Sequence, residues 1–344
     1  MAKQRSWFRT NLKPNSFRSK DEKRLKIMQI YRHYEDLPPE AKGCSVAIGN
    51  FDGVHKGHQA VIHEAGVHAK DMGGPWAVLT FEPHPVSLFQ PEKAPFRLSP
   101  LRNKAQHIAD LGVDYMLVMH FDLEFSKRIA ETFVDDILVG GLGARHVVAG
   151  YDFVFGNGRK GNCELLLAMG AQEGYGFTCV KPVSDDDGLP YSSTRVRECL
   201  RNADPKGASF VLGRDYEIEG RVEKGDQRGR TIGFPTANVR LGEYLEPAKG
   251  VYAVRAGVET AEGIEWIDGV ANLGNRPTFD KKDVLLEVNL FDFDGDLYGK
   301  HLRVALADFI RPETKFDGID ALQAQIAEDC DRARLLLAGH PKPV

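Results

Sequence analysis

The first half of the chain alternates short apolar runs with longer amphipathic stretches. Apolar runs of strand length occur at 45–48, 76–81, 115–121 and 146–149. Helix-length stretches separate them, beginning near Gly57, Leu101 and Ser126. This alternation predicts a parallel sheet with helices on its faces and a ligand site at the carboxyl ends of the strands. We therefore expect an α/β fold from residue 27 to about residue 177.

Beyond residue 213 the pattern changes to short strands separated by turns. Six strands are expected, at 216–223, 236–240, 251–258, 264–273, 285–293 and 302–310. Six short strands at this spacing indicate a small antiparallel barrel. Residues 317–337 then carry apolar side chains at helical spacing, which predicts a terminal helix packed on the barrel.

The segment 202–207, NADPKG, is the best candidate for a linker, and a short helix ending near Leu212 follows it. We accordingly divide the chain into an arm at 1–26, an α/β domain at 27–203 and a barrel domain at 204–344. The arm has nine Lys or Arg against two acidic residues. It is expected to be a flexible, solvated tail, with nucleic-acid binding or an organellar presequence as open alternatives.

The composition narrows the class of protein. The chain has 344 residues, of which 42% are hydrophobic and 27% charged, as in a globular protein with two domains. No apolar run approaches the roughly 20 residues that span a bilayer, and there is no apolar signal core, so we expect a cytoplasmic protein without membrane contact. The five cysteines are odd in number and widely spaced, which argues against a disulfide framework or a structural zinc site.

The sequence GNFDGVHKGH, residues 49–58, carries the first candidate chemistry. It follows an apolar run, where a buried strand should turn into a helix. Backbone N–H groups and the positive end of the helix dipole favour phosphate at such a helix start. His55 and His58 could donate hydrogen bonds to phosphoryl oxygens, and Gly57 lets phosphate approach the backbone. The alternative is one capping and one surface histidine, and HxGH alone does not decide between them.

Three further clusters follow expected strands in this half. Two prolines stiffen the loop around His84, for which a rigid turn is the favoured interpretation. Residues 151–156, YDFVFG, place aromatic rings beside Asp152, which suits a nucleotide base, and the basic residues at 159–160 suit phosphate. Residues 192–197, SSTRVR, precede a helix, where hydroxyls act as caps and two arginines suit pyrophosphate.

The barrel half contains no GxxxxGK[ST] sequence, which excludes a Walker-type phosphate loop. A Gly- and Arg-rich segment could instead wrap phosphate with backbone N–H groups; its candidate residues are Gly225, Arg228, Gly229, Arg230 and Gly233. Thr236 and Asn238 offer neutral oxygens that suit an Mg²⁺ that keeps waters and ATP oxygens. Glu287 could take the proton from a hydroxyl that attacks ATP. A turn between strands and a solvated glutamate are the structural alternatives.

Eight motifs together resemble the bacterial bifunctional riboflavin kinase/FAD synthetase family over about residues 27–338. They are, in order, GNFDGVHKGH, YDFVFG, SSTRVR, GRVEKGDQRGRTIGFPTAN, GVYAV, GVANLGNRPTF, LLEVNLFDFDGDLYG and IRPETKF. The resemblance implies an N-terminal Rossmann-like nucleotidyltransferase domain that transfers AMP from ATP to FMN and releases FAD and pyrophosphate. It also implies a six-stranded flavokinase barrel with a terminal helix, which phosphorylates riboflavin to FMN with ATP and Mg²⁺.

The same resemblance implies residue roles. His55 and His58 stabilise the ATP phosphates, and Glu287 activates the ribityl hydroxyl of riboflavin. The other ATP-binding residues of the adenylyltransferase half are Gly49, Phe51, Asp52, Gly57, Asp152, Ser193, Thr194 and Arg197. In the kinase half, the Gly- and Arg-rich segment binds ATP, and Thr236 and Asn238 hold its Mg²⁺. ATP, riboflavin and FMN are the expected partners; we do not expect nucleic-acid binding, and the oligomeric state stays open.

The chain departs from the family pattern at four positions. Val154 and Pro190 stand where basic or polar residues are common, and Lys224 and Asn289 stand where histidine is usual. These departures leave an alternative in which one module is degenerate and a single activity survives. A second alternative is a flavin-binding regulator that uses the basic arm on nucleic acid, against which HxGH, PTAN and Glu287 argue.

Overall fold

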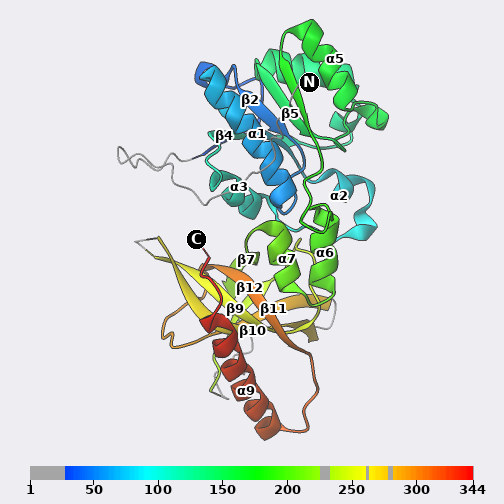
Figure 1. Cartoon of the computed structure of the whole chain (residues 1–344). Helices are drawn as coiled ribbons and strands as arrows, with labels where there is room; N and C mark the ends of the chain where they lie inside the picture. The colour runs from blue at the N-terminus through cyan, green and yellow to red at the C-terminus, as the bar shows by residue number, and fades with distance from the viewer. Residues whose placement is uncertain (1–27, 225–232, 261–262, 278–281, 344) are drawn as a thin grey trace, which may run out of the picture.

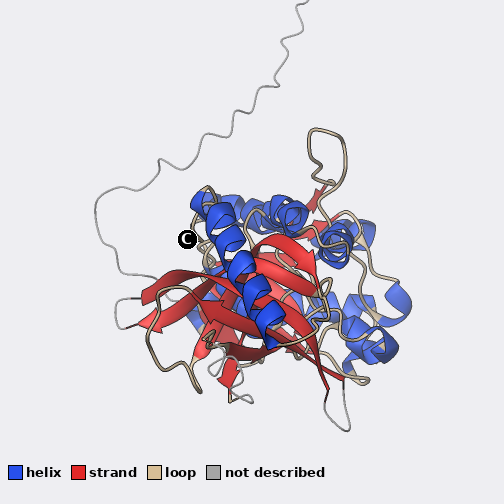
Figure 2. Cartoon of the chain, turned by 90° about the horizontal axis from the view of Figure 1, so that it is seen from below, coloured by secondary structure: helices blue, strands red, loops and turns tan. Residues whose placement is uncertain are grey.

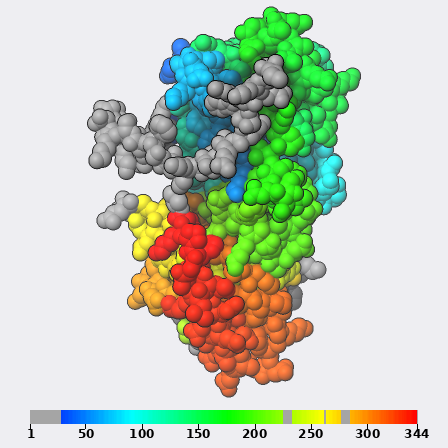
Figure 3. Space-filling model, viewed as in Figure 1, coloured from blue at the N-terminus to red at the C-terminus, as the bar shows by residue number. Residues whose placement is uncertain are grey.

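The computed structural model describes residues 28–224, 233–260, 263–277 and 282–343. The first half of the chain forms an α/β unit and the second a β-barrel, and the two lie end to end (Figure 1). The space-filling view shows the same arrangement, with the blue-to-green unit above the yellow-to-red one (Figure 3). The predicted basic arm lies outside the described residues, as do Gly225, Arg228, Gly229 and Arg230.

A six-stranded sheet forms the centre of the α/β unit, with strand order β1-β4-β3-β2-β5-β6 and every pair parallel. The strands are β1 (Gln29–Tyr31), β2 (Ser45–Ile48), β3 (Trp76–Glu82), β4 (Tyr115–His120), β5 (His146–Gly150) and β6 (Gly176–Val180). The predicted α/β fold is confirmed. The apolar pattern does not predict β1 and β6, because these edge strands keep part of their side chains exposed.

Helices cover both faces of this sheet. One core contains Ala47 of β2 with α1 (Lys56–Met72) and α3 (Leu101–Ala109). The opposite core contains Val46 and Ile48 with α4 (Ala130–Phe133), η4 (Val134–Gly141) and α5 (Cys163–Glu173). Because both faces are buried, the central strands are continuous apolar runs. The single helix expected from Ser126 is divided into η3 (Phe125–Lys127), α4 and the π-helical η4.

The barrel is closed, with strand order β10-β11-β8-β7-β12-β9 and antiparallel pairs. Its strands are β7 (Tyr216–Glu223), β8 (Ala237–Arg240), β9 (Gly250–Thr260), β10 (Gly263–Pro277), β11 (Lys282–Leu290) and β12 (His301–Pro312). Seen from below, α9 (Ile319–Ala338) crosses the outside of the barrel (Figure 2). Ala333 and Leu337 of α9 are buried in one apolar cluster with Val251 and Ala253 of β9. The predicted six-stranded barrel with a terminal helix is confirmed.

Of the segment 202–207 predicted as a linker, residues 202–204 form a tight turn between α6 (Ser193–Arg201) and α7 (Pro205–Leu212), and residues 205–207 are already the start of α7. Asp204 caps α7 by accepting a hydrogen bond from Gly207 N–H at 2.8 Å. Val196 of α6 and Val211 of α7 are buried in the same cluster as the interior of the barrel. The two helices are thus packed onto the barrel and reach back to the α/β unit. None of the described helices is apolar over a length that would cross a lipid bilayer.

Candidate active sites

A strained turn joins β2 to α1. Three of its residues have positive φ, at 49°, 86° and 44°: Phe51, Gly53 and Val54. Such a backbone costs about 1–3 kcal/mol at a non-glycine residue, so its surroundings must hold it in place. The two glycines predicted to bind ATP permit close packing here. A Cβ on Gly49 would lie 3.0 Å from the Phe51 ring, and one on Gly57 would lie 2.9 Å from the Tyr191 carbonyl oxygen.

His55 and His58 stand side by side at the start of α1, with stacked rings whose centroids are 3.6 Å apart. His55 Nδ1 accepts a hydrogen bond from the His58 backbone N–H at 3.3 Å, so the neutral His55 ring carries its proton on Nε2. The Phe51 ring meets the His58 ring edge-on, with centroids 5.4 Å apart, and is itself buried. His58 Nδ1 is buried without a hydrogen-bond partner among the described residues, which marks a place for a ligand.

Burial lowers the pKa of both imidazoles. It brings the pKa of His55 to about 4, with Asp52 opposing the change and two nearby arginines adding to it. For His58, burial first, and then His55 and Lys104, hold the pKa well below its usual range. Both rings are therefore neutral at pH 7. Each offers phosphate an N–H hydrogen bond rather than a positive charge.

Asp52 is 2% exposed, and protein groups occupy its carboxylate. Oδ1 accepts hydrogen bonds from the backbone N–H groups of Leu98 and Ser99, both at 3.0 Å, and Oδ2 accepts one from Arg197 Nη2 at 2.5 Å. The carboxylate therefore fixes Arg197 and the neighbouring loop, and its charge would repel phosphate. This geometry favours a positioning role over the direct ATP contact expected from the sequence.

The SSTRVR stretch begins α6 beside the strained turn, although 141 positions separate the two along the chain. Ser192 caps the helix through its hydroxyl. Ser193 Oγ donates to the backbone oxygen of Asp52 at 2.8 Å, and Arg197 pairs with the Asp52 carboxylate. Thr194 is exposed at the same helix start. The fold thus brings the predicted hydroxyl and arginine cluster next to the histidine turn.

A buried charge cluster that no motif marks lies near the histidine pair. Lys104 of α3 is 0% exposed, and its Nζ lies 2.9 Å from Glu82 Oε1. Arg97 donates to both Glu82 oxygens, at 2.6 and 3.0 Å. The charge of Lys104 contributes to the low pKa of His58, so it acts on the site. The available sequence signal is a lysine on the apolar face of a helix, where lysine is rarely buried unless paired.

The two remaining candidates of this half differ in their surroundings. His84 caps α2 (Pro85–Phe89) by accepting from Val86 N–H at 3.2 Å, as expected for a rigid turn. Asp152 is exposed just past the end of β5. A Cβ on Gly150 would lie 3.3 Å from its Oδ1 and 3.9 Å from the Val61 side chain of α1. The Asp152 carboxylate and the Val61 side chain therefore both lie next to Gly150, and Val61 follows the histidines on α1.

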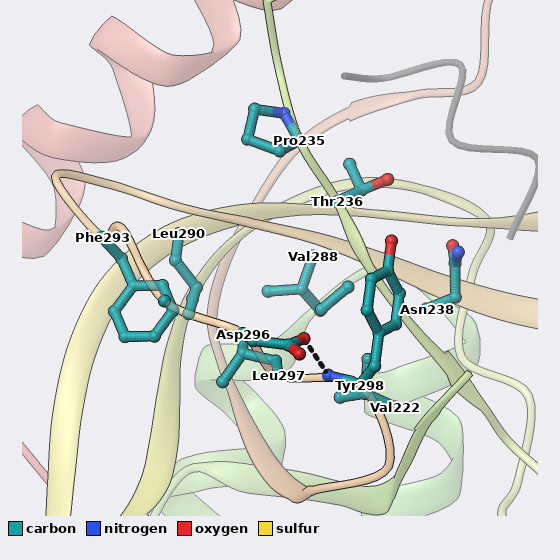
Figure 4. Close-up of a pocket in the computed structure, with 12 residues that line it drawn as sticks. Val222, Pro235, Thr236, Asn238, Val288, Leu290, Phe293, Asp296, Leu297 and Tyr298 are labelled. Carbon is teal, nitrogen blue, oxygen red and sulfur yellow. Dashed lines mark hydrogen bonds between the residues drawn. The ribbon is translucent and has the colours of Figure 1, made fainter. Parts of the chain in front are cut away.

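The barrel has a pocket whose wall includes both predicted Mg²⁺ ligands (Figure 4). Thr236, Asn238 and the hydroxyl of Tyr298 lie on one side, and Leu290 and Phe293 lie on the other. The pocket thus has a polar side that suits phosphate and metal and an apolar side that suits a ring system.

Glu287 lies directly opposite Asn238 in the pairing of β11 with β8. Directly opposed residues of an antiparallel pair project to the same face, so the carboxylate and the amide are neighbours outside the barrel core. Asn238 is 7% exposed, and its Oδ1 is buried without a hydrogen-bond partner among the described residues. That oxygen and the Thr236 hydroxyl are neutral oxygen ligands of the kind that Mg²⁺ binds together with water and phosphate. No group of three or more His, Cys, Asp or Glu among the described residues could hold a metal alone.

A second cavity adjoins this pocket between β11 and α9 and shares Leu290 and Phe293 with it. Arg334 of α9 lies over the Phe291 ring, 4.2 Å from its centroid. Asn289, one of the departures from the family pattern, donates from Nδ2 to the Pro235 oxygen at 2.8 Å and so fixes the chain just before Thr236. The cavity is suited to a flat aromatic ligand whose polar end enters the first pocket.

Two family models match the chain: one described as FAD synthetase over residues 37–195, and one described as riboflavin kinase over residues 212–337. Similar relatives are named bifunctional riboflavin kinase/FMN adenylyltransferase. The one from Escherichia coli K12 is 42% identical over 305 residues, which are 89% of this chain and 96% of the relative. The one from Bacillus subtilis 168 is 38% identical over 314 residues, which are 90% of this chain and 97% of the relative.

A solved structure from Streptococcus pneumoniae, described as a macrolide-efflux protein, matches with a TM-score of 0.77 at 32% identity and covers 90% of this chain and 99% of that one. This likeness shows that both units share their fold with that protein. The two family models and the named relatives agree on flavin enzymes. The chain therefore belongs to the family of bacterial bifunctional riboflavin kinase/FMN adenylyltransferases.

Proposed function

We propose that the two activities, riboflavin phosphorylation and FMN adenylylation, take place at two separate sites. FMN is made at the barrel pocket, and FAD is made at the turn before α1. The observation that carries this proposal is one unpartnered buried atom at each site: His58 Nδ1 beside the stacked imidazoles, and Asn238 Oδ1 next to Glu287. Such an atom costs about 1–3 kcal/mol unless a ligand satisfies it.

In the adenylyl transfer, a phosphate oxygen of FMN attacks the α-phosphorus of ATP, and pyrophosphate leaves. His55 and His58 donate N–H hydrogen bonds to the phosphoryl oxygens, while Arg197 and Lys104 supply positive charge. Because the protein fixes these groups before the reaction, they stabilise developing charge without reorganising, and no protein nucleophile is needed. The further proposed ATP contacts are Gly49, Gly57, Asp152, Ser193 and Thr194.

In the kinase reaction, Glu287 accepts the proton of the ribityl hydroxyl as that oxygen attacks the γ-phosphorus of ATP, and ADP leaves. Thr236 and Asn238 would hold Mg²⁺, which neutralises phosphate charge when it is bound with ATP. The cavity between β11 and α9 takes the flavin ring system. The further proposed ATP contacts are Gly225, Arg228, Gly229, Arg230 and Gly233.

The proposed division at residues 203 and 204 is supported by the family matches, one of which stops at residue 195 while the other starts at residue 212. We further propose a cytoplasmic location, which the composition of the chain supports.

Two substitutions in the full-length protein test the separate sites. Glu287→Gln is expected to lower FMN formation by about 10²- to 10⁴-fold, because the general base is lost, and to leave FAD formation from supplied FMN unchanged. His58→Ala is expected to lower FAD formation from supplied FMN and to leave FMN formation unchanged. His63→Ala on the same helix and Glu265→Gln on β10 are matched controls and should change neither activity. Loss of both activities in either test variant would contradict the proposal.

A time course distinguishes the remaining alternative. Supplied with riboflavin, ATP and Mg²⁺, the protein should accumulate FMN first and FAD afterwards, as followed by chromatography of the products. A mixture that stops at FMN would favour the alternative in which the adenylyltransferase module is degenerate.

A further inference from the structure

The second half of the chain helps to hold the turn that carries the histidines. α7 ends at the left-handed cap Gly213, and Arg214 follows immediately, before β7 begins. Arg214 Nη2 donates to the Gly53 backbone oxygen at 2.8 Å, and Nη1 donates to the Val54 oxygen at 3.3 Å. These two carbonyl groups belong to positive-φ residues directly before His55.

Other contacts join the same two segments. The Gln59 side chain donates to the Val54 oxygen at 2.9 Å and to the Leu212 oxygen at 2.8 Å, so it bridges the turn and the end of α7. A Cβ on Gly53 would lie 3.6 Å from the Leu212 side chain, and one on Gly213 would lie 3.4 Å from the first residue of α1. The turn is therefore clamped between α1 and the end of α7.

The conformation of Val54 shows why a clamp is needed. Its φ is 44°, and its side chain is 1% exposed. A β-branched residue adopts positive φ only where the surrounding structure over-determines it. An arginine is suited to this task because its planar fork can donate to two neighbouring oxygens at once. Burial lowers the pKa of Arg214 to about 10, so the guanidinium is still charged at neutral pH.

We propose that Arg214 is a positioning residue for adenylyl transfer: by fixing the carbonyl groups of Gly53 and Val54, it sets the orientation in which His55 and His58 meet the ATP phosphates. Arg214 acts through the turn and touches no substrate. This inference rests on the proposed role of the histidines. It goes further, because Arg214 lies within the segment that matches riboflavin kinase, 212–337, and outside the segment that matches FAD synthetase, 37–195. FAD formation then depends on a residue of the kinase half.

The test is Arg214→Met in the full-length protein, with both activities measured. Methionine keeps much of the apolar stem but donates no hydrogen bond to the turn. Since a displacement of about 1 Å costs a reaction about 10²-fold, kcat for FAD formation from supplied FMN should fall by about that factor, with KM values and the riboflavin kinase rate within about twofold of wild type. Arg214→Lys keeps the charge without the planar fork, so its kcat for FAD formation should lie between those of wild type and Arg214→Met.

Arg102→Met is the matched control. Arg102 also connects the two units, through ion pairs from α3 to Glu219 at 2.6 Å and Glu259 at 3.1 Å, but these pairs do not involve the turn. Arg102→Met should therefore leave FAD formation unchanged. The proposal is overturned if Arg214→Met and Arg102→Met lower FAD formation equally. It is also overturned if Arg214→Met lowers FMN and FAD formation equally, or if it lowers neither. Should Arg214→Met fail to fold, wild-type FAD formation by Arg214→Lys overturns the proposal.

His58→Ala, measured in parallel, separates this inference from the proposed site. If His58→Ala loses FAD formation while Arg214→Met keeps it, the positioning role is wrong and the histidine site stands. If His58→Ala keeps full FAD formation, the histidine site is wrong and the inference falls with it.

Discussion

Asp52→Asn should damage the adenylyltransferase site and leave the barrel pocket intact. The substitution keeps the size of the side chain but removes the charge that pairs with Arg197. One carboxylate oxygen becomes an amide donor, and it must face either Arg197 or the backbone N–H groups of Leu98 and Ser99. At least one donor then meets another donor. Because Asp52 is 2% and Arg197 19% exposed, water replaces the lost partner poorly.

The structure sets the size of this effect. Breaking a buried ion pair by removing one partner costs about 3–5 kcal/mol. Arg197 keeps a hydrogen bond from Nε to the Phe96 oxygen at 3.0 Å, which places the cost at the lower end. At about 2–4 °C per kcal/mol for a unit of this size, a loss of about 3 kcal/mol lowers its Tm by about 6–12 °C. Displacement of Arg197 should also slow FAD formation by about 10²-fold.

Scanning calorimetry, combined with separate assays of FMN and FAD formation, measures both effects. Glu124→Gln is the matched control, because Glu124 forms an exposed pair with Lys127 at 3.0 Å, and it should change neither Tm nor activity. A Tm shift in Asp52→Asn below about 2 °C, or FAD formation at the wild-type rate, would refute this account of the buried pair.

Three further predictions concern pH, metal and charge. The pKa of His55 is about 4 against 6.5 in a free side chain, so the unfolded chain binds more protons between these values. The free energy of unfolding should therefore decrease as pH falls from about 6.5 to about 4, in thermal unfolding at stepped pH. Asn238→Leu should raise the Mg²⁺ concentration needed for half-maximal FMN formation and leave FAD formation unchanged. Lys104→Met removes one cause of the low pKa of His58, so the acid limb of the pH profile of FAD formation should move to higher pH.

Each of these predictions has a contrary outcome. Stability that is constant between pH 6.5 and 4 would contradict the buried, neutral state of His55. If Asn238→Leu needs the same Mg²⁺ concentration as wild type for half-maximal FMN formation, Asn238 is not a ligand of the metal. An acid limb in Lys104→Met that coincides with the wild-type limb would show that Lys104 does not act on His58.

The sequence predicts the fold where burial dominates the pattern. β2 has four consecutive buried residues, and the last three are apolar and end at the turn residues that follow. The edge strands β1 and β6 lack this signal, because part of each strand faces solvent. The apolar pattern also does not predict that the expected helix from Ser126 divides into α and π segments. Residues 134–141 remain apolar on one side in either geometry, and periodicity alone does not separate the two.

The candidate site divides in the same way. His55, His58, Thr236 and Asn238 could be predicted because short motifs contain them. The partners that set their geometry are distant in sequence: Glu82 and Lys104 are 22 positions apart, and Arg214 and Gly53 are 161 apart. No local pattern encodes such pairs, since each depends on which distant segments the fold brings together.

The strained turn shows what these distant contacts achieve. Its successive carbonyl oxygens accept hydrogen bonds from side chains that follow far along the chain: Ser193 donates to Asp52, and Arg214 donates to Gly53 and Val54. Because the protein already occupies these acceptors, the backbone oxygens do not point unpaired negative dipoles at an incoming phosphate, and the N–H groups at the start of α1 can face it. Ser193 begins α6 and Arg214 follows α7, so the two packed helices hold both ends of the turn. The segment that connects the α/β unit to the kinase barrel therefore holds the turn at which we propose adenylyl transfer.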